Sequence, residues 1–290
     1  MKKTVFKGAG VAIVTPFYDD LTVNYDKMAE LVEYHIANGT DAIIVCGTTG
    51  EASTLTDEEH KDLITFVVKK AAGRIPVIAG TGSNDTVYAV ELAKHAAEVG
   101  ADAQLQVTPY YNKTTQKGLI KHFTTIADAA DLPVILYNVP GRTGMNITPE
   151  TYKALSEHPN IVATKEANGD VASVIKTISL CGDDLNVYSG DDGLITPMLS
   201  VGAKGVISVL SNIFPKQTHD ICAEYFAGNV AKSAELQIKY IDIINALFIE
   251  TNPIPVKAAM NHLGFNVGQC RLPLCEMGEN NFNKLCELLK

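Results

Sequence analysis

A short, β-branched and almost continuous apolar run recurs eight times along this chain and constrains its fold more than any other feature. Each run is followed by a longer segment with helical periodicity, and the spacing leaves room for one strand and one helix per unit. Apolar runs without alternation are typical of parallel strands that are buried on both faces. The runs are Val11–Thr15, Ala42–Cys46, Pro76–Ala79, Ala103–Val107, Pro133–Tyr137, Ile161–Thr164, Asn186–Ser189 and Gly205–Val209.

The segments between these runs carry helix signals. Residues 26–38 place apolar side chains on one face and precede Gly39, which predicts a helix that ends there. Thr56 and Glu59 have the spacing of a capping box at a helix start. Thr148 precedes a proline, the order expected of a capping hydroxyl and the first helical residue.

Strand and helix units that alternate eight times predict an α/β protein built as a closed (β/α)8 barrel. A doubly wound open sheet would have fewer strands and a phosphate-binding glycine turn after the first, and the sequence around Gly80 and Gly82 lacks the third glycine. Strand signals end near residue 215. We therefore expect a catalytic barrel over residues 1–228 and a C-terminal helical region over residues 229–290.

Composition excludes several classes of partner. The formal charge is −9, from 24 basic and 33 acidic residues, and no run of Lys or Arg would contact a nucleic-acid backbone. No apolar stretch approaches the roughly 18–20 residues that cross a bilayer, and the N-terminal residues lack the apolar core of a signal peptide. These observations favour a cytoplasmic protein that binds neither nucleic acid nor membrane.

The six cysteines and seven histidines are spread along the chain without CxxC, HExxH or His-x-His spacing. Such spacing marks zinc sites, whereas disulfide frameworks are typical of short secreted chains. We expect most of the cysteines to be small buried residues and no structural metal.

Lys165 directly follows the sixth apolar run and is the strongest catalytic candidate, since the active site of such a barrel lies at the carboxyl ends of its strands. Alternation predicts two faces of this strand, Ile161, Ala163 and Lys165 inward against Val162, Thr164 and Glu166 outward. A partly desolvated amine favours its neutral form and can attack a carbonyl carbon. The structural alternative is an ion pair with an acid such as Asp191.

Other strand ends also carry reactive side chains. Tyr137 shares the inward face with Ile135, where its phenol could relay protons or bond a backbone carbonyl as an ordinary core tyrosine. Thr48 and Thr49 lie in a glycine-flanked turn that could hold a small carboxylate or only stabilise the turn. Arg142 could grip a carboxylate with two parallel hydrogen bonds or form a surface salt bridge.

Two acids, Asp191 and Asp192, follow the seventh run, where barrels of this type often bind phosphate. Their charge would repel a phosphate, which favours a substrate without one. The alternative is that they hold a divalent metal ion.

These residues together resemble the dihydrodipicolinate synthase family, over nearly the whole chain from Gly10 to Lys257. The resemblance implies that Lys165 forms a Schiff base with pyruvate and that the enamine attacks L-aspartate 4-semialdehyde. Ring closure then gives a hydroxy-tetrahydrodipicolinate on the route to diaminopimelate and lysine. No dissociable cofactor is implied, because the covalent Schiff base serves as electron sink. The matching motifs are Gly47–Glu51, Tyr110–Asn112, Tyr137–Gly144, Lys165–Ala167, Ser189–Asp192 and Gly205–Ser208.

The resemblance also implies roles for individual residues. Thr48, Tyr137 and Tyr111 would form a proton relay, with Tyr111 supplied by a neighbouring subunit. The protein would therefore be a homo-oligomer, and the family is usually a tetramer built as a dimer of dimers.

Substrate binding follows from the same resemblance. Thr48 and Thr49 would bind the pyruvate carboxylate, and Arg142 would bind the carboxylate of the semialdehyde. The backbone carbonyls of Gly190 and Ile207 would line the surroundings of the catalytic lysine.

Many members of this family are inhibited by lysine at a dimer interface. Three residues fit that pocket, namely His60, Asn84 and Tyr110. Ala52, Asp57 and Tyr88 depart from the sensitive pattern. We therefore expect feedback inhibition to be weak or absent.

Two other classes of function are weighed against this one. A sister aldolase with the same lysine chemistry, such as N-acetylneuraminate lyase or a 2-keto-3-deoxy sugar acid aldolase, would open the region of Arg142, Tyr110 and Tyr111 for a polyhydroxylated chain. A catalytically silent binding barrel would be expected to lack Lys165 or Tyr137. The sequence favours the synthase.

Overall fold

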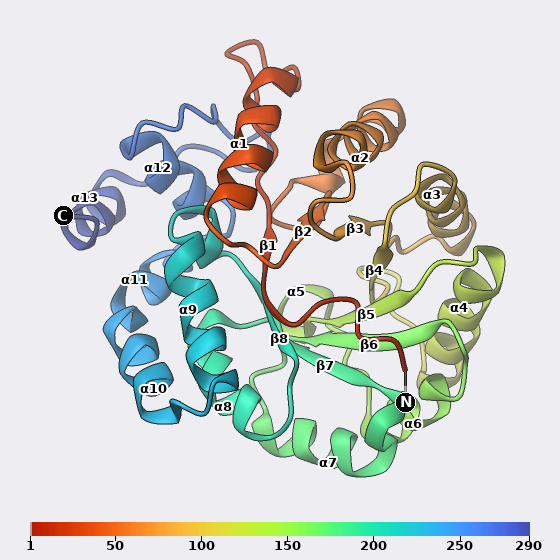
Figure 1. Cartoon of the computed structure of the whole chain (residues 1–290). Helices are drawn as coiled ribbons and strands as arrows, with labels where there is room; N and C mark the ends of the chain where they lie inside the picture. Colours follow the sequence, from red (N-terminus) through yellow and green to blue (C-terminus); the bar gives the residue numbers. More distant parts are fainter. Residues whose placement is uncertain (1) are drawn as a thin grey trace.

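The computed structural model describes residues 2–290, and within them eight parallel strands close a barrel in chain order, β1 to β8 (Figure 1). The helices that connect the strands surround this barrel, and α10 to α13 pack on one side of it (Figure 1). The predicted (β/α)8 barrel with further C-terminal helices is confirmed. The strands are β1 (Gly8–Ala12), β2 (Ala42–Val45), β3 (Val77–Gly80), β4 (Ala103–Val107), β5 (Val134–Asn138), β6 (Ile161–Glu166), β7 (Asn186–Ser189) and β8 (Gly205–Ser208).

Helices follow every strand of the described chain, some of them preceded by a short 3-10 turn. The α-helices are α1 (Tyr25–Ala37), α2 (Asp57–Ala71), α3 (Thr86–Glu98), α4 (Gln116–Ala129), α5 (Pro140–Thr143), α6 (Pro149–Ser156), α7 (Val171–Cys181), α8 (Ile195–Ser200), α9 (Pro215–Phe226), α10 (Val230–Lys239), α11 (Ile241–Ala246), α12 (Ile254–His262) and α13 (Glu279–Leu288). The 3-10 turns are η1 (Ala52–Thr54), η2 (Gly182–Asp184), η3 (Asp192–Leu194) and η4 (Leu210–Asn212).

The predicted helix boundaries are confirmed to within a residue or so. Gly39, with φ of 76°, lies just beyond the C-cap of α1. Thr56 and Glu59 form both hydrogen bonds of a capping box at the start of α2. Thr148 accepts a hydrogen bond from the backbone N–H of Thr151, which satisfies one of the free donors at the start of α6.

The first strand lies earlier than predicted, at Gly8–Ala12 instead of Val11–Thr15. The strand contains glycines in place of β-branched residues, so it lacks the pattern that predicts a strand. A Cβ at Gly10 would lie 2.8 Å from the side chain of Ile44 and 2.9 Å from the ring of Phe6. Close packing inside the barrel therefore selects glycine at this point of the strand, in place of a strong strand former.

A bulge in β6 corrects the predicted faces of Ile161 and Val162. Val134 of β5 pairs with Ile161, but the next residue of β5 pairs with Ala163, so Val162 is the extra residue. Val162 and Ala163 join the apolar cluster inside the barrel, whereas Ile161 packs outside it, against α4 and α6. Beyond the bulge the alternation holds, and Lys165 faces inward as predicted.

The interior of the barrel is closed by aromatic side chains near the amino end of β1. Phe6 and Tyr188 stack with their ring centroids 4.3 Å apart, and the hydroxyl of Tyr188 donates to the backbone carbonyl of Phe6 at 2.6 Å. In Figure 1 the N-terminal segment runs across the barrel before it enters β1. The remaining cavity therefore opens at the carboxyl ends of the strands.

The C-terminal helices continue from the barrel without a break in packing. Helix α9 packs on β1, and α10 packs against α9. Helix α11 contacts η3, which follows β7, and α12 contacts η4, which follows β8. The region therefore reaches the carboxyl ends of the strands. None of the helices within residues 2–290 has the length and apolar character needed to cross a membrane.

Candidate active site

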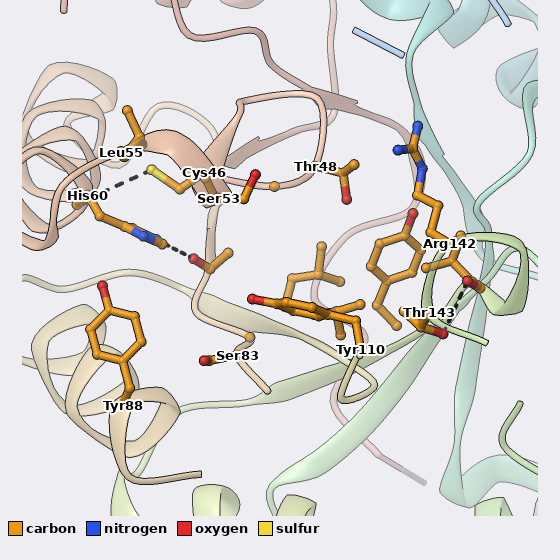
Figure 2. Close-up of a pocket in the computed structure, with 18 residues that line it drawn as sticks. Cys46, Thr48, Ser53, Leu55, His60, Ser83, Tyr88, Tyr110, Arg142 and Thr143 are labelled. Atoms are coloured by element: carbon orange, nitrogen blue, oxygen red, sulfur yellow. Dashed lines mark hydrogen bonds between the residues drawn. The ribbon is translucent and has the colours of Figure 1, made fainter. Parts of the chain in front are cut away.

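A cavity of about 370 Å³ opens at the carboxyl ends of β2 to β5. Thr48 follows β2, Tyr110 follows β4, and both Tyr137 and Arg142 come from β5 and the turn after it. Figure 2 shows Thr48 and Arg142 at one end of this cavity, His60 and Tyr88 at the other and Tyr110 between them. The chain thus brings together side chains that the sequence places more than ninety residues apart.

Lys165 does not itself line this cavity, but it packs against Tyr137, which does, and only 6% of its surface is exposed. Its Nζ atom is 4.3 Å from the centroid of the Tyr137 ring, because the two residues are register partners on β5 and β6. None of the ion pairs within residues 2–290 includes Lys165. The amine is held by packing and by the aromatic ring face, without a fixed countercharge.

The two acids after β7 accept hydrogen bonds from backbone N–H groups. Asp191 accepts a hydrogen bond from the N–H of Gly193 at 2.8 Å. Asp192 is buried and accepts from the N–H groups of Val209 and Leu210, each at 2.9 Å. The alternative of a Lys165–Asp191 ion pair is thus not formed in the described chain. Nor do residues 2–290 contain a cluster of three or more His, Cys, Asp or Glu side chains placed to hold a metal ion.

Gly190 lies where the lysine side chain needs room. A Cβ at Gly190 would be 3.1 Å from both Cγ and Cε of Lys165 and 2.8 Å from Cβ of Ala167. Glycine therefore leaves space for the lysine side chain. Ile207 belongs to the buried cluster inside the barrel, together with Tyr137.

The turn after β2 presents free backbone donors. Among the backbone–backbone hydrogen bonds outside helices and strands in residues 2–290, none uses the N–H of Thr48 or Thr49 as donor. Thr48 lines the cavity, and Thr49 is buried behind it with 3% exposure. Free N–H groups and a hydroxyl in one turn can bind a carboxylate.

The two neighbouring tyrosines, Tyr110 and Tyr111, differ in exposure and in their position relative to the cavity. Tyr110 lines the cavity, whereas Tyr111 is 94% exposed and does not line it. Tyr111 also has φ of 66°, a left-handed conformation that is rare for a bulky residue. No hydrogen bond in the described chain joins Tyr111 to Thr48 or Tyr137. Within one chain the predicted relay is therefore incomplete.

The residues predicted for an inhibitor site divide between two hollows. His60 lines the main cavity and places Nε2 2.7 Å from the backbone carbonyl oxygen of Gly80, and its burial lowers its pKa. Tyr110 lines the same cavity. The side chain of Asn84 donates to the carbonyl of Tyr110 at 3.1 Å but lines a neighbouring hollow of about 320 Å³.

Glu166 forms a buried polar cluster on the outer face of the barrel, directly behind the catalytic candidate. Its carboxylate accepts hydrogen bonds from Asn138 Nδ2 at 2.9 Å, from the hydroxyl of Tyr152 at 2.8 Å and from the N–H of Asn168 at 3.1 Å. Burial nevertheless raises the pKa of Glu166 to about 7, because desolvation outweighs these donors. The cluster fixes β6 next to Lys165.

The C-terminal helical region also reaches the site, a contribution that the sequence analysis missed. Asn252 donates from its side chain to Thr49 Oγ1 at 3.0 Å, and its carbonyl accepts from Arg142 Nη2 at 3.1 Å. Lys257 of α12 forms a buried ion pair with Glu51 at 2.9 Å. The available signal was a lysine in the otherwise apolar segment that begins α12.

Comparisons with known proteins agree with this geometry. Residues 5–290 match the model of the Dihydrodipicolinate synthetase family. The 4-hydroxy-tetrahydrodipicolinate synthase of Acetivibrio thermocellus is 59% identical over 290 residues, which cover 100% of this chain and 98% of that protein. The enzyme of the same name from Clostridium perfringens strain 13 is 57% identical over 286 residues, with 99% and 98% coverage.

Solved structures give the same result. Dihydrodipicolinate synthase from Aquifex aeolicus has a TM-score of 0.96 and 49% identity, and the match covers 98% of this chain and 97% of that one. A chloride-inhibited dihydrodipicolinate synthase from Acinetobacter baumannii complexed with pyruvate has a TM-score of 0.96 and 46% identity, with 99% and 98% coverage. The chain therefore belongs to the dihydrodipicolinate synthetase family of lyases.

Proposed function

We propose that this lyase acts as a 4-hydroxy-tetrahydrodipicolinate synthase, in which Lys165 captures pyruvate and the enamine attacks L-aspartate 4-semialdehyde. The observation that carries the proposal is the environment of Lys165. It is a buried amine against the ring of Tyr137, a residue that lines the cavity, and it forms no ion pair in the described chain. An amine that is not tied to a carboxylate is available to attack a carbonyl carbon.

The first step joins the amine nitrogen of Lys165 to the keto carbon of pyruvate and releases water. Loss of a methyl proton then gives the enamine, whose carbon attacks the aldehyde of the second substrate. The amino group of that substrate displaces the lysine from the imine carbon, which closes the ring and frees Lys165. These steps need proton transfers and no oxidant or reductant, and we propose no cofactor beyond the covalent Schiff base.

The polar groups around the cavity suit these steps. The hydroxyls of Tyr137 and Thr48 can carry protons at the reacting carbons, since both residues line the cavity. The turn with Thr48 and Thr49 binds the pyruvate carboxylate through its free N–H groups and hydroxyls. Arg142 binds the carboxylate of the semialdehyde with its remaining donors. The surroundings of Lys165 are completed by Gly190 and Ile207.

We further propose that Tyr111 completes the relay of a neighbouring subunit. Its exposure of 94% and its left-handed backbone support a side chain that functions outside its own chain. Such an enzyme is at least a dimer, and we propose a homotetramer built as a dimer of dimers. We place it in the cytoplasm, a reducing compartment that suits its six free cysteines.

Trapping with borohydride tests the proposal directly. Pyruvate and borohydride together should add a pyruvate-derived mass to the peptide that contains Lys165, and the Lys165→Met variant should show no such mass. A wild-type peptide that remains unmodified would refute the mechanism. Initial rates with L-aspartate 4-semialdehyde and with N-acetylmannosamine then separate the synthase from a sugar-acid aldolase. Preference for the sugar would overturn the proposed substrate.

Regulation by lysine is proposed to be weak or absent, with His60, Asn84 and Tyr110 as the residues that any bound lysine would contact. Asp57 supports this, because its carboxylate already accepts a hydrogen bond from Lys61 at 2.8 Å, which lowers its pKa. A titration of the initial rate with lysine checks the proposal. Strong inhibition at low concentration would contradict it.

A further inference from the structure

Asn252 joins two active-site residues from outside the barrel. It lies two residues before α12 in the C-terminal helical region and is only 5% exposed. Its side-chain Nδ2 donates to Thr49 Oγ1 at 3.0 Å, across 203 positions of sequence. Its backbone carbonyl accepts from Arg142 Nη2 at 3.1 Å. One residue thus contacts a side chain at each of the two sites that are proposed to bind substrate carboxylates.

We infer that Asn252 is a positioning residue that fixes the donor directions of Thr49 and Arg142 toward the two substrate carboxylates. This inference rests on the proposed function of the same site. A threonine hydroxyl carries one hydrogen and two acceptor positions. Because the amide of Asn252 occupies an acceptor position of Thr49, the hydroxyl hydrogen is left free to be donated to a bound carboxylate.

Arg142 is held in a complementary way. Its guanidinium has five N–H donors in one plane, and one of them is bound to the carbonyl of Asn252. Fixing that donor sets the plane of the group, so that the remaining donors keep one orientation toward the cavity. An otherwise exposed arginine would lose side-chain entropy on binding a carboxylate, and a fixed one loses less.

The support beneath Asn252 is rigid. Five residues further along, Lys257 forms a buried ion pair with Glu51, which lies in the same turn as Thr49. Lys257 also donates to the carbonyl of Thr15 at 3.1 Å. The C-terminal region is therefore fastened to the loop that it orients, and small movements of the tail are coupled to the carboxylate site.

Only one of the two polar atoms in the side chain of Asn252 has a hydrogen-bond partner in the described chain. Its Oδ1 atom is buried and has no hydrogen-bond partner within residues 2–290. A buried polar atom without a partner is destabilising, and in native proteins such atoms are often found at functional sites. A purely structural contact would not favour an amide here over a well-packed apolar side chain.

Steady-state kinetics of Asn252→Ala and Asn252→Asp test the inference. We expect Asn252→Ala to raise KM for pyruvate about tenfold, because the side-chain hydrogen bond that orients Thr49 is lost. KM for the semialdehyde should rise less, because Arg142 bonds the backbone carbonyl of residue 252, which alanine retains. Asn252→Asp keeps the shape but adds a negative charge beside both carboxylates, so its KM values should rise further. At saturating pyruvate, borohydride should still trap Lys165 in both variants, since the nucleophile is untouched.

The matched control is Asn261→Ala. Asn261 lies in the same helix α12 and bonds the backbone at Gly268 and Val267, away from Thr49 and Arg142. It should leave KM within about twofold of the wild type even if it weakens the C-terminal region. Equal KM effects of Asn252→Ala and Asn261→Ala would mean that Asn252 has only a structural role, which would overturn the inference.

A double-mutant cycle with Thr49→Val adds a second readout. If Asn252 acts through Thr49, the effect of Asn252→Ala on KM for pyruvate should shrink in the Thr49→Val background. If the two substitutions change KM for pyruvate independently, Asn252 does not act through Thr49. The proposed function fails separately, since then the wild type itself would not be trapped at Lys165. If the wild type is trapped and Asn252→Ala keeps wild-type KM values, only this inference fails.

Discussion

The replacement Lys257→Met should destabilise this protein far more than its conservative shape suggests. The side chains of Lys257 and Glu51 are 2% and 1% exposed, and Nζ lies 2.9 Å from Oε1. The ammonium also donates to the backbone carbonyls of Thr15 at 3.1 Å and Gln269 at 2.7 Å. Methionine fills the volume but leaves the Glu51 carboxylate buried without its countercharge.

Removing one partner of a buried ion pair costs about 3–5 kcal/mol. The N–H of Arg271 still donates to Oε2 of Glu51 at 2.9 Å, so a value near the lower end is expected. For a chain of this size that loss lowers Tm by about 6–20 °C. The measurement is thermal unfolding at one fixed protein concentration, since association would also shift Tm.

Two further variants make the reasoning refutable. Glu51→Gln combined with Lys257→Met removes both charges and should recover much of the lost stability. Lys216→Met breaks an exposed pair with Asp220 and should change Tm only slightly. A Lys257→Met variant no less stable than Lys216→Met, or a double variant less stable than Lys257→Met, would show that the pair is not the anchor inferred here.

Three other predictions concern the site itself. Gly190→Ala places a Cβ 3.1 Å from Cε of Lys165, so it should lower the free energy of unfolding by about 1–3 kcal/mol and slow Schiff-base formation. Stopped-flow trapping measures that rate, and an unchanged rate would contradict the prediction. Tyr111→Phe should lower kcat about 100-fold while borohydride still traps Lys165, and full activity would exclude the relay in trans. The pKa of Glu166 is raised from 4.5 to about 7, so its contribution to stability is present below 4.5 and lost as pH rises through 7. Urea unfolding of Glu166→Gln should therefore depend less on pH over that range than the wild type, and equal dependence would refute the shift.

Local patterns were sufficient to predict most of the barrel. A buried parallel strand needs an apolar run, and seven of the eight runs fall on the observed strands. The bounds of the first strand were predicted wrongly, because residue 10 has to be glycine to make room for the Phe6 ring and Ile44, and that packing is not visible in the strand's own sequence. The extra residue Val162 in β6 is likewise set by pairing with β5, and pairing is not visible within one strand.

Some residues of the candidate site could be predicted from local patterns, and others could not. Lys165 and Tyr137 lie at strand ends, where the barrel architecture itself gives their direction, so sequence reasoning could place them together. Asn252 could not be found by such reasoning. Its contact with Thr49 spans 203 positions and depends on how the tail packs, and no periodicity in either segment encodes that packing.

The two buried lysines show how packing, and not residue type, supports Lys165 as the proposed nucleophile. Lys165 and Lys257 each interrupt an apolar segment, so the sequence offers the same signal for both. The N–H donors of Lys257 are directed at Glu51 and two backbone carbonyls, and although burial lowers its pKa, the adjacent carboxylate opposes that shift. Lys165 has the aromatic face of Tyr137, a residue that lines the cavity, in place of acceptors. Of the two lysines, only Lys165 has an Nζ atom that is not already bonded to acceptors in the described chain, so the absence of partners around Lys165, and not its burial alone, supports its proposed catalytic role.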